Sequence, residues 1–180
     1  AQESRGLGDV YKRQMAFDAK AAIGQYKQTM EWLLAMLEAT DESRFDWKPQ
    51  AEGGDPTSIS EILKHCTQFG AGLQLLVTGT GIPAEPEVDD YFSSATWATA
   101  GPAGNLRTKA ELVAFIRNQV EETIRLAEAA TEEIWSREWD LGFMKNSCAG
   151  WFQMLTGHWT WHMGQVAYIQ RLYSDTSFGG

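Results

Sequence analysis

The C-terminal part of the chain, residues 148–173, reads CAGWFQMLTGHWTWHMGQVAYIQRLY. Its apolar and histidine residues recur every three or four positions, which predicts one long helix over this stretch. One face of that helix carries a stripe made of Leu155, His158, His162, Gln165, Val166, Ile169 and Leu172. Because residues four apart lie one turn apart on the same face, we expect the imidazoles of His158 and His162 to point together toward a packed interior.

The remaining histidine of the chain, His65, lies in a second amphipathic stretch. Ser58 and Glu61 have the spacing of a capping box, which predicts that this helix begins at residues 57–58. The pattern continues to the glycines near 78–81 and places His65 on the apolar side, between Ile62 and Phe69. We therefore expect all three imidazoles to face one interior.

Apolar residues at helical spacing predict two further helices, over about 17–39 and about 108–130. Thr108 and Glu111 form another capping box at the start of the later one. The connector 131–147 has a short helical turn around Ile134 and Trp135, and no convincing strand pattern. Residues 79–107 form a long connection, which favours a crossover along the bundle rather than a tight hairpin. These features predict an all-α fold, a four-helix bundle.

Large aromatic residues lie in two of the predicted loops. Phe45 and Trp47 precede a segment broken by proline and glycine, and we expect them to cap one end of the bundle. Tyr91, Phe92 and Trp97 lie in the long connection 79–107. These three either form a roof over a pocket or pack on the surface of the bundle, and the sequence leaves both options open.

Length and charge limit the kind of protein this is. A chain of 180 residues fits one domain with a substantial core. The net charge of −9 argues against nucleic acid and anionic membrane surfaces as partners, because both need a basic surface. No apolar run reaches the length of about 18 residues expected of a membrane span. Two cysteines do not make a disulfide framework, so a cytoplasmic location is the default expectation.

The first fourteen residues, AQESRGLGDVYKRQ, are polar and aperiodic, unlike the rest of the chain. An amphipathic pattern begins directly after Met15. We interpret residues 1–14 as a non-native or disordered tail and residues 15–180 as the folded domain.

Two interpretations of the histidines compete. A single histidine on an apolar face is usually a core residue satisfied by one hydrogen bond. Three imidazoles buried without partners, however, would cost several kcal/mol in total, on the order of 1–3 kcal/mol for each unsatisfied group. Binding a metal ion would remove that cost. Trp159 follows His158 where a metalloprotease helix has its glutamate, and no Glu-x-x-His pair of a di-iron bundle is present. The pattern therefore favours a mononuclear centre in which His65, His158 and His162 bind one metal ion.

Such a centre supports two kinds of chemistry. A bound metal can lower the pKa of a water molecule to about 7, or it can hold a small thiol as the nucleophilic thiolate. Gln165 lies three residues after His162 on the same face, where it either orients a water or substrate group or makes an ordinary hydrogen bond. Cys66 points about 100° away from His65 on the helix, so we predict a small core residue rather than a ligand.

Three segments together resemble one known family. They are FDWKP at 45–49, SISEILKH at 58–65 and HWTWHMGQVAYIQRLY at 158–173, with one histidine on the second helix and H-x-x-x-H on the last. In this order the chain resembles the DinB/YfiT-like superfamily. The resemblance implies a four-helix bundle with up-down-down-up connectivity, and it implies that His65, His158 and His162 bind a divalent zinc, nickel, iron or manganese ion.

The resemblance also implies frequent homodimers and, in some relatives, thiol-dependent S-transfer or mycothiol-dependent isomerisation of maleylpyruvate. We therefore expect a metal-dependent transferase that activates a low-molecular-weight thiol and acts on a small-molecule substrate. Metal-dependent hydrolysis is the nearest enzymatic alternative. A non-enzymatic, stress-related bundle with a structural or sensory metal is the alternative from another class, and it requires a closed site with a fourth protein ligand.

Overall fold

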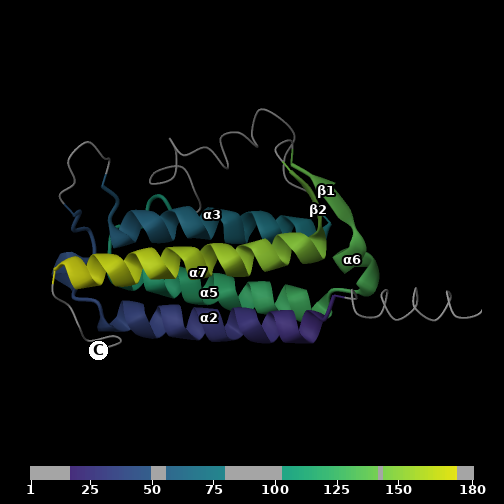
Figure 1. The fold of residues 1–180 in the computed structure, drawn as a ribbon, viewed down its shortest axis with the longest axis horizontal. Helices are drawn as coiled ribbons and strands as arrows, with labels where there is room; N and C mark the ends of the chain where they lie inside the picture. Colours follow the sequence, from purple (N-terminus) through teal and green to yellow (C-terminus); the bar gives the residue numbers. More distant parts are fainter. Residues whose placement is uncertain (1–16, 50–55, 80–102, 142–143, 174–180) are drawn as a thin grey trace, which may run out of the picture.

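A computed structural model of the chain describes residues 17–49, 56–79, 103–141 and 144–173. Four long helices lie side by side in one bundle (Figure 1). They are α2 (Ala19–Ala39), α3 (Ile59–Thr78), α5 (Lys109–Ala129) and α7 (Cys148–Leu172). The predicted all-α four-helix bundle is confirmed, with helix ends within one or two residues of the expected positions.

The predicted capping boxes mark the starts of two helices. The Glu61 amide donates to Ser58 Oγ over 3.2 Å, and the Ser58 amide donates back to Glu61 Oε2 over 2.9 Å. Thr108 and Glu111 make the same reciprocal pair at the start of α5, over 3.2 and 3.0 Å. Gly79 ends α3 with a φ of 77°, a left-handed conformation that glycine adopts without steric cost. These contacts satisfy backbone groups that helix ends leave open.

Contacts between helices define the direction in which each one runs. Tyr26 packs on Phe152 with ring centroids 5.5 Å apart, and Gln170 Nε2 donates to Thr40 Oγ1 over 2.7 Å. The residue that comes later on the α2 side contacts the residue that comes later on α7, so α2 and α7 run in the same direction.

The other two helices run the opposite way. Lys27 near the start of α2 pairs with Glu128 near the end of α5 over 2.7 Å. Glu38 near the end of α2 pairs with Arg117 of α5 over 2.7 Å. On α3, His65 lies next to His158 of α7. Phe69 follows His65 in the chain, but it packs on Trp151, which comes before His158. The connectivity is therefore up-down-down-up, as the resemblance implied.

This connectivity places the end of α3 and the start of α5 at opposite ends of the bundle (Figure 1). The expected crossover falls on the segment between them, of which residues 80–102 lie outside the described residues. Tyr91, Phe92 and Trp97 of that connection lie outside the described residues, as does the predicted tail 1–14.

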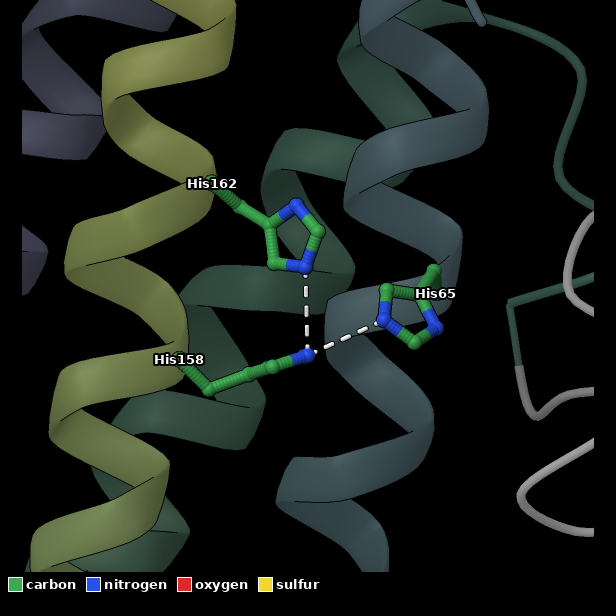
Figure 2. A group of neighbouring side chains, drawn as sticks. All are labelled: His65, His158 and His162. Carbon is green, nitrogen blue, oxygen red and sulfur yellow. Dashed lines mark hydrogen bonds between the residues drawn. The ribbon is translucent and has the colours of Figure 1, made fainter. Parts of the chain in front are cut away.

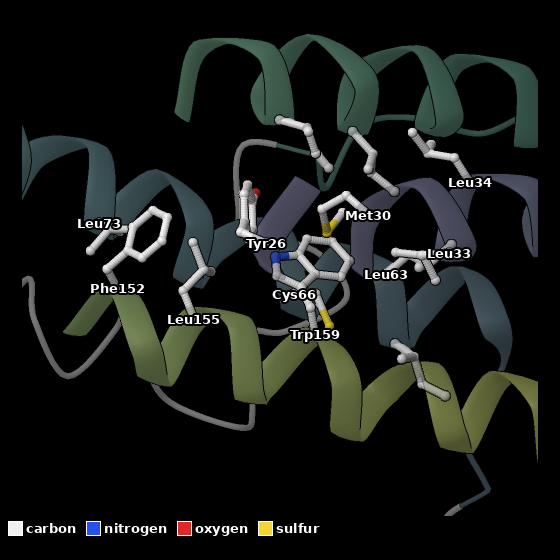
Figure 3. Packing of buried hydrophobic residues seen from close by; sticks show 14 of the residues in the cluster. Tyr26, Met30, Leu33, Leu34, Leu63, Cys66, Leu73, Phe152, Leu155 and Trp159 are labelled. Carbon is white, nitrogen blue, oxygen red and sulfur yellow. The ribbon is translucent and has the colours of Figure 1, made fainter. Parts of the chain in front are cut away.

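Side chains from α2, α3 and α7 meet in the core (Figure 3). Trp159 and Phe152 of α7 are buried against Tyr26 and Met30 of α2. The Cys66 side chain is fully buried among them, so the prediction that it is a small core residue is confirmed. Burial of this apolar surface is the main force that holds the helices together.

The loop aromatics before α3 lie where the sequence predicted them, at one end of the bundle. Phe45 follows a short 3-10 helix, η1 (Glu42–Arg44), and is 2% exposed. Its carbonyl accepts from the Ser60 amide over 3.1 Å, which ties the loop to α3. Trp47 packs edge-on against Tyr173 with ring centroids 5.2 Å apart.

The connector between α5 and α7 differs in part from the expectation. The predicted helical turn is present as α6 (Glu132–Ser136). Two short antiparallel strands follow, β1 (Glu138–Asp140) and β2 (Lys145–Ser147), paired with Glu138 opposite Ser147. The expectation of no strand was wrong here, because three-residue strands are too short to show an alternating apolar pattern. Within the described ranges, no helix is both long and apolar enough to cross a membrane.

Candidate metal centre

The three histidines of the chain meet between α3 and α7 (Figure 2). His158 Nε2 lies 2.9 Å from His65 Nε2 and 3.2 Å from His162 Nε2. One ligand atom from each ring lies within 4.8 Å of the other two. The rings come together although His65 and His158 lie 93 residues apart in the chain.

The separations between the nitrogen atoms suit a metal ion. Two imidazole nitrogens at about 2.0–2.1 Å from one ion are about 2.8–3.0 Å apart at a right angle and about 3.3–3.4 Å apart at the tetrahedral angle. The observed 2.9 and 3.2 Å fall within that range. Each of the two pairs that His158 makes therefore has a separation that ligands of one shared metal ion would have.

Packing positions the rings on both helices. His158 stacks on Phe69 of α3, with ring centroids 5.0 Å apart and planes inclined by 28°. Trp151 and Trp159 are each 1% exposed and anchor α7 in the core on either side of His158. Trp161 differs from both, because it is 71% exposed and does not pack in the core. Buried tryptophans thus fix the rotation of α7 and, with it, the direction of His158.

All three rings favour the neutral state that binds metals. Burial, followed by the nearby His162, lowers the pKa of His65 to about 4. Burial, followed by the two neighbouring imidazoles, lowers the pKa of His158 to about 3. Burial also lowers the pKa of His162, although its bond to Gln165 acts in the opposite direction. At neutral pH each ring therefore has a lone pair available for a metal ion.

Gln165 contacts one of the rings directly. Its Oε1 lies 2.6 Å from His162 Nδ1. With an amide oxygen as the acceptor, Nδ1 must carry the proton, so Nε2 of the neutral ring directs its lone pair toward the other two histidines. Of the two roles left open by the sequence, the geometry matches the hydrogen bond, made to a ring of the site itself.

His158 has a different environment at its second nitrogen. Its Nδ1 is buried and has no hydrogen-bond partner among the described residues. Metal-binding histidines usually donate this N–H to an acceptor. Here the stack on Phe69, rather than a hydrogen bond within the described ranges, sets the orientation of the ring.

A cleft of about 800 Å³ opens beside the three histidines. Besides His65, His158, His162 and Gln165, its wall includes Ile62, Trp161, Gly164 and Tyr168. Within the described part of the chain, the cluster around the nitrogen atoms contains no fourth histidine, cysteine or carboxylate. The centre is therefore reachable from the cleft.

Trp161 and Tyr168 were not predicted as site residues. A signal was present, because both lie on the exposed side of the predicted helix, seven residues apart, where large aromatics are uncommon without a function.

Fold and site together define a four-helix bundle with a candidate three-histidine metal centre between two of its helices. A family model for the DinB superfamily matches residues 25–166. The chain therefore belongs to the DinB superfamily, and the resemblance read from its motifs is confirmed. A search of curated proteins found no match.

Several solved structures share the fold. A DinB-like protein from Bacillus subtilis is 21% identical, with a TM-score of 0.59 over 85% of this chain and 92% of that one. A mycothiol-dependent maleylpyruvate isomerase is 15% identical, with a TM-score of 0.64 over 82% of this chain but only 60% of the isomerase. The colibactin self-resistance protein ClbS, solved in complex with a dsDNA, is 10% identical, with a TM-score of 0.68 over 87% of this chain and 98% of that one.

Proposed function

We propose that this protein is a metal-dependent transferase that activates a low-molecular-weight thiol at the three-histidine centre. His65, His158 and His162 are the proposed ligands of one divalent ion, for which the family resemblance suggests zinc, nickel, iron or manganese. The observation that carries the proposal is the convergence of three neutral imidazole nitrogens beside an open cleft. Structural metal sites are usually closed by a fourth protein ligand, whereas catalytic sites keep a position open.

A divalent ion held there supplies positive charge that lowers the pKa of a thiol and favours the nucleophilic thiolate. The chain contributes the environment. Burial keeps the three rings neutral, Gln165 holds the proton of His162 on Nδ1, and the cleft gives a second molecule access. The described lining of the cleft contains no carboxylate that would act as a general base for water, which favours thiol transfer over hydrolysis.

The comparison structures are compatible with this proposal. One of them is named as a mycothiol-dependent enzyme, so the fold supports thiol-dependent chemistry in another protein. The alternatives are a metal-dependent hydrolase and a non-enzymatic, stress-related metal-binding bundle. The open cleft favours an enzyme over the bundle, because a structural or sensory ion needs no access for a small molecule.

The metal is tested first, by elemental analysis of protein purified without chelators. We expect about one divalent ion per chain in the wild type and none in a variant with His65, His158 and His162 all replaced by alanine. A matched control replaces Gln153, an exposed residue of α7 that lies outside the cleft at the centre, and it should retain the metal. Metal-free wild type from every preparation would contradict the proposal.

Turnover is tested with metal-loaded protein, a model electrophile, and bacillithiol, mycothiol, glutathione or coenzyme A as the thiol. We expect one thiol to give turnover that His158→Ala abolishes and Gln153→Ala preserves. If no thiol gives turnover above that of His158→Ala, the proposed transferase activity is wrong. Ester hydrolysis by the same preparation would then favour the hydrolase.

We further propose a homodimer that binds neither nucleic acid nor membranes and is located in the cytoplasm. The homodimer is supported by the family resemblance, which implies frequent homodimers. The net charge of −9 opposes DNA binding, even though one protein of the same fold was solved with dsDNA. Light scattering measures the first property, and a DNA mobility shift at low salt measures the second.

A further inference from the structure

Two exposed aromatic side chains of α7 frame the cleft beside the metal centre. Trp161 is 71% and Tyr168 is 64% exposed, and both line the cleft together with Gly164. Positions 161, 164 and 168 share one side of the helix. The backbone positions of Trp161 and Tyr168 are therefore about 10 Å apart along the helix axis, with Gly164 between them. The three residues form a slot, which we call the aromatic slot.

Nothing in the described structure requires a glycine at position 164. Its backbone is not among those with positive φ, and an added Cβ would meet no atom within 4 Å. Glycine inside a helix is less favourable than alanine, so local stability does not explain it either. The absent side chain does have one consequence, which is open space between Trp161 and Tyr168.

The slot lies in a cleft without charged side chains. The described lining residues include no Asp, Glu, Lys or Arg. A negative charge on a bound molecule, away from the metal centre, would therefore meet no compensating cation among the described lining residues, in a protein of net charge −9.

We propose that the aromatic slot binds the acceptor of the transfer reaction, and that this acceptor is an uncharged electrophile with a flat, apolar ring or conjugated system. This inference rests on the proposed function and names the substrate class of the same site. Aromatic faces stack well on flat apolar groups, and the tyrosine hydroxyl supplies one polar contact. A cleft of about 800 Å³ lies within the range of small-molecule sites.

The slot is tested by equilibrium binding, which needs no turnover. The probes are 1-naphthylmethanol and naphthalene-1-sulfonate, which share a ring and differ in charge, titrated calorimetrically into the full-length, zinc-loaded chain. We expect the alcohol to bind and the sulfonate to bind at least about fivefold more weakly. Equal or tighter binding of the sulfonate would overturn the proposal.

Two pairs of variants locate the binding. Gly164→Leu fills the slot, whereas Gly157→Leu fills equally open space on α7 outside this cleft. We expect Gly164→Leu to weaken binding of the alcohol at least about tenfold and Gly157→Leu to leave it within twofold. Tyr168→Ala should weaken binding, while Trp32→Ala, which removes an exposed aromatic of α2, should not. Equal effects within either pair would contradict the slot.

The two proposals fail differently. Selective binding of the alcohol without turnover with any thiol would support the aromatic slot as a binding site and contradict the proposed transferase activity. Turnover that Gly164→Leu and Gly157→Leu affect equally would leave the transferase in place and remove the slot.

Discussion

The Nδ1 atom of His162 lies 2.6 Å from Oε1 of Gln165, one helical turn further along α7. This bond holds the ring so that its other nitrogen faces His158 at 3.2 Å. Partners of this kind fix the tautomer and the orientation of a metal-binding histidine, and their loss typically lowers metal affinity 10- to 100-fold, by about 1–3 kcal/mol.

Gln165→Ala is therefore expected to lower zinc affinity by about one to two orders of magnitude, because His162 loses its acceptor. Gln165→Glu retains an acceptor and should keep affinity close to that of the wild type. Competition with a chromophoric chelator measures both values. Gln153→Ala is the matched control on the same helix, and an equal affinity of Gln165→Ala and Gln153→Ala would show that the bond does not support the site.

The metal-free protein should lose stability as the pH falls below about 6.5, the usual pKa of histidine. The folded state holds the pKa of His65 at about 4 and that of His158 at about 3, so the unfolded chain takes up protons first. Stability contributed by the neutral rings is thus complete above about 6.5 and is lost progressively until the pH passes these folded values.

Urea unfolding between pH 7.5 and 5 in chelator measures this dependence. A variant with all three histidines replaced by glutamine should show a clearly shallower decline, because the carboxylates titrate alike in both proteins. Parallel pH profiles for the two proteins would mean that the rings are not held neutral by the fold.

Trp159 and Trp161 provide a matched pair for the packing of α7, since they are 1% and 71% exposed. Trp159→Ala should lower the free energy of unfolding by about 3–5 kcal/mol, the usual cost of a large cavity in a core. Trp161→Ala should change it by less than about 0.5 kcal/mol. Urea denaturation in one buffer gives both values, and a comparable loss in both variants would contradict the assigned orientation of α7.

Ser58 caps α3 two turns before His65, and its side chain accepts from the Glu61 amide. Ser58→Ala should cost about 1 kcal/mol of stability, because that amide loses its acceptor. Ser58→Thr keeps the hydroxyl and should recover most of the loss. Thermal unfolding of the three proteins checks this order, and equal stability of the alanine and threonine variants would rule out the capping contribution.

Local features of the fold were readable from the sequence. The capping boxes at Ser58 and Thr108 join residues that are only three positions apart, so the contact is predictable from the local sequence alone. The strands β1 and β2 were missed, because their pairing depends on contacts such as that between Trp151 Nε1 and the Trp139 carbonyl rather than on a repeating pattern.

The metal site likewise has features that the sequence predicts and features that only the packing of the helices determines. Helical periodicity alone assigned His65, His158 and His162 to interior faces, because the side from which a residue projects follows from its position in the turn. Periodicity does not determine how far one helix is shifted along another. The 2.9 Å between His65 and His158 depends on the packing of α3 against α7, through contacts such as Phe69 with His158. The cleft and its aromatic slot likewise exist only once the helices are assembled, because a cavity is a property of surfaces that the chain brings together.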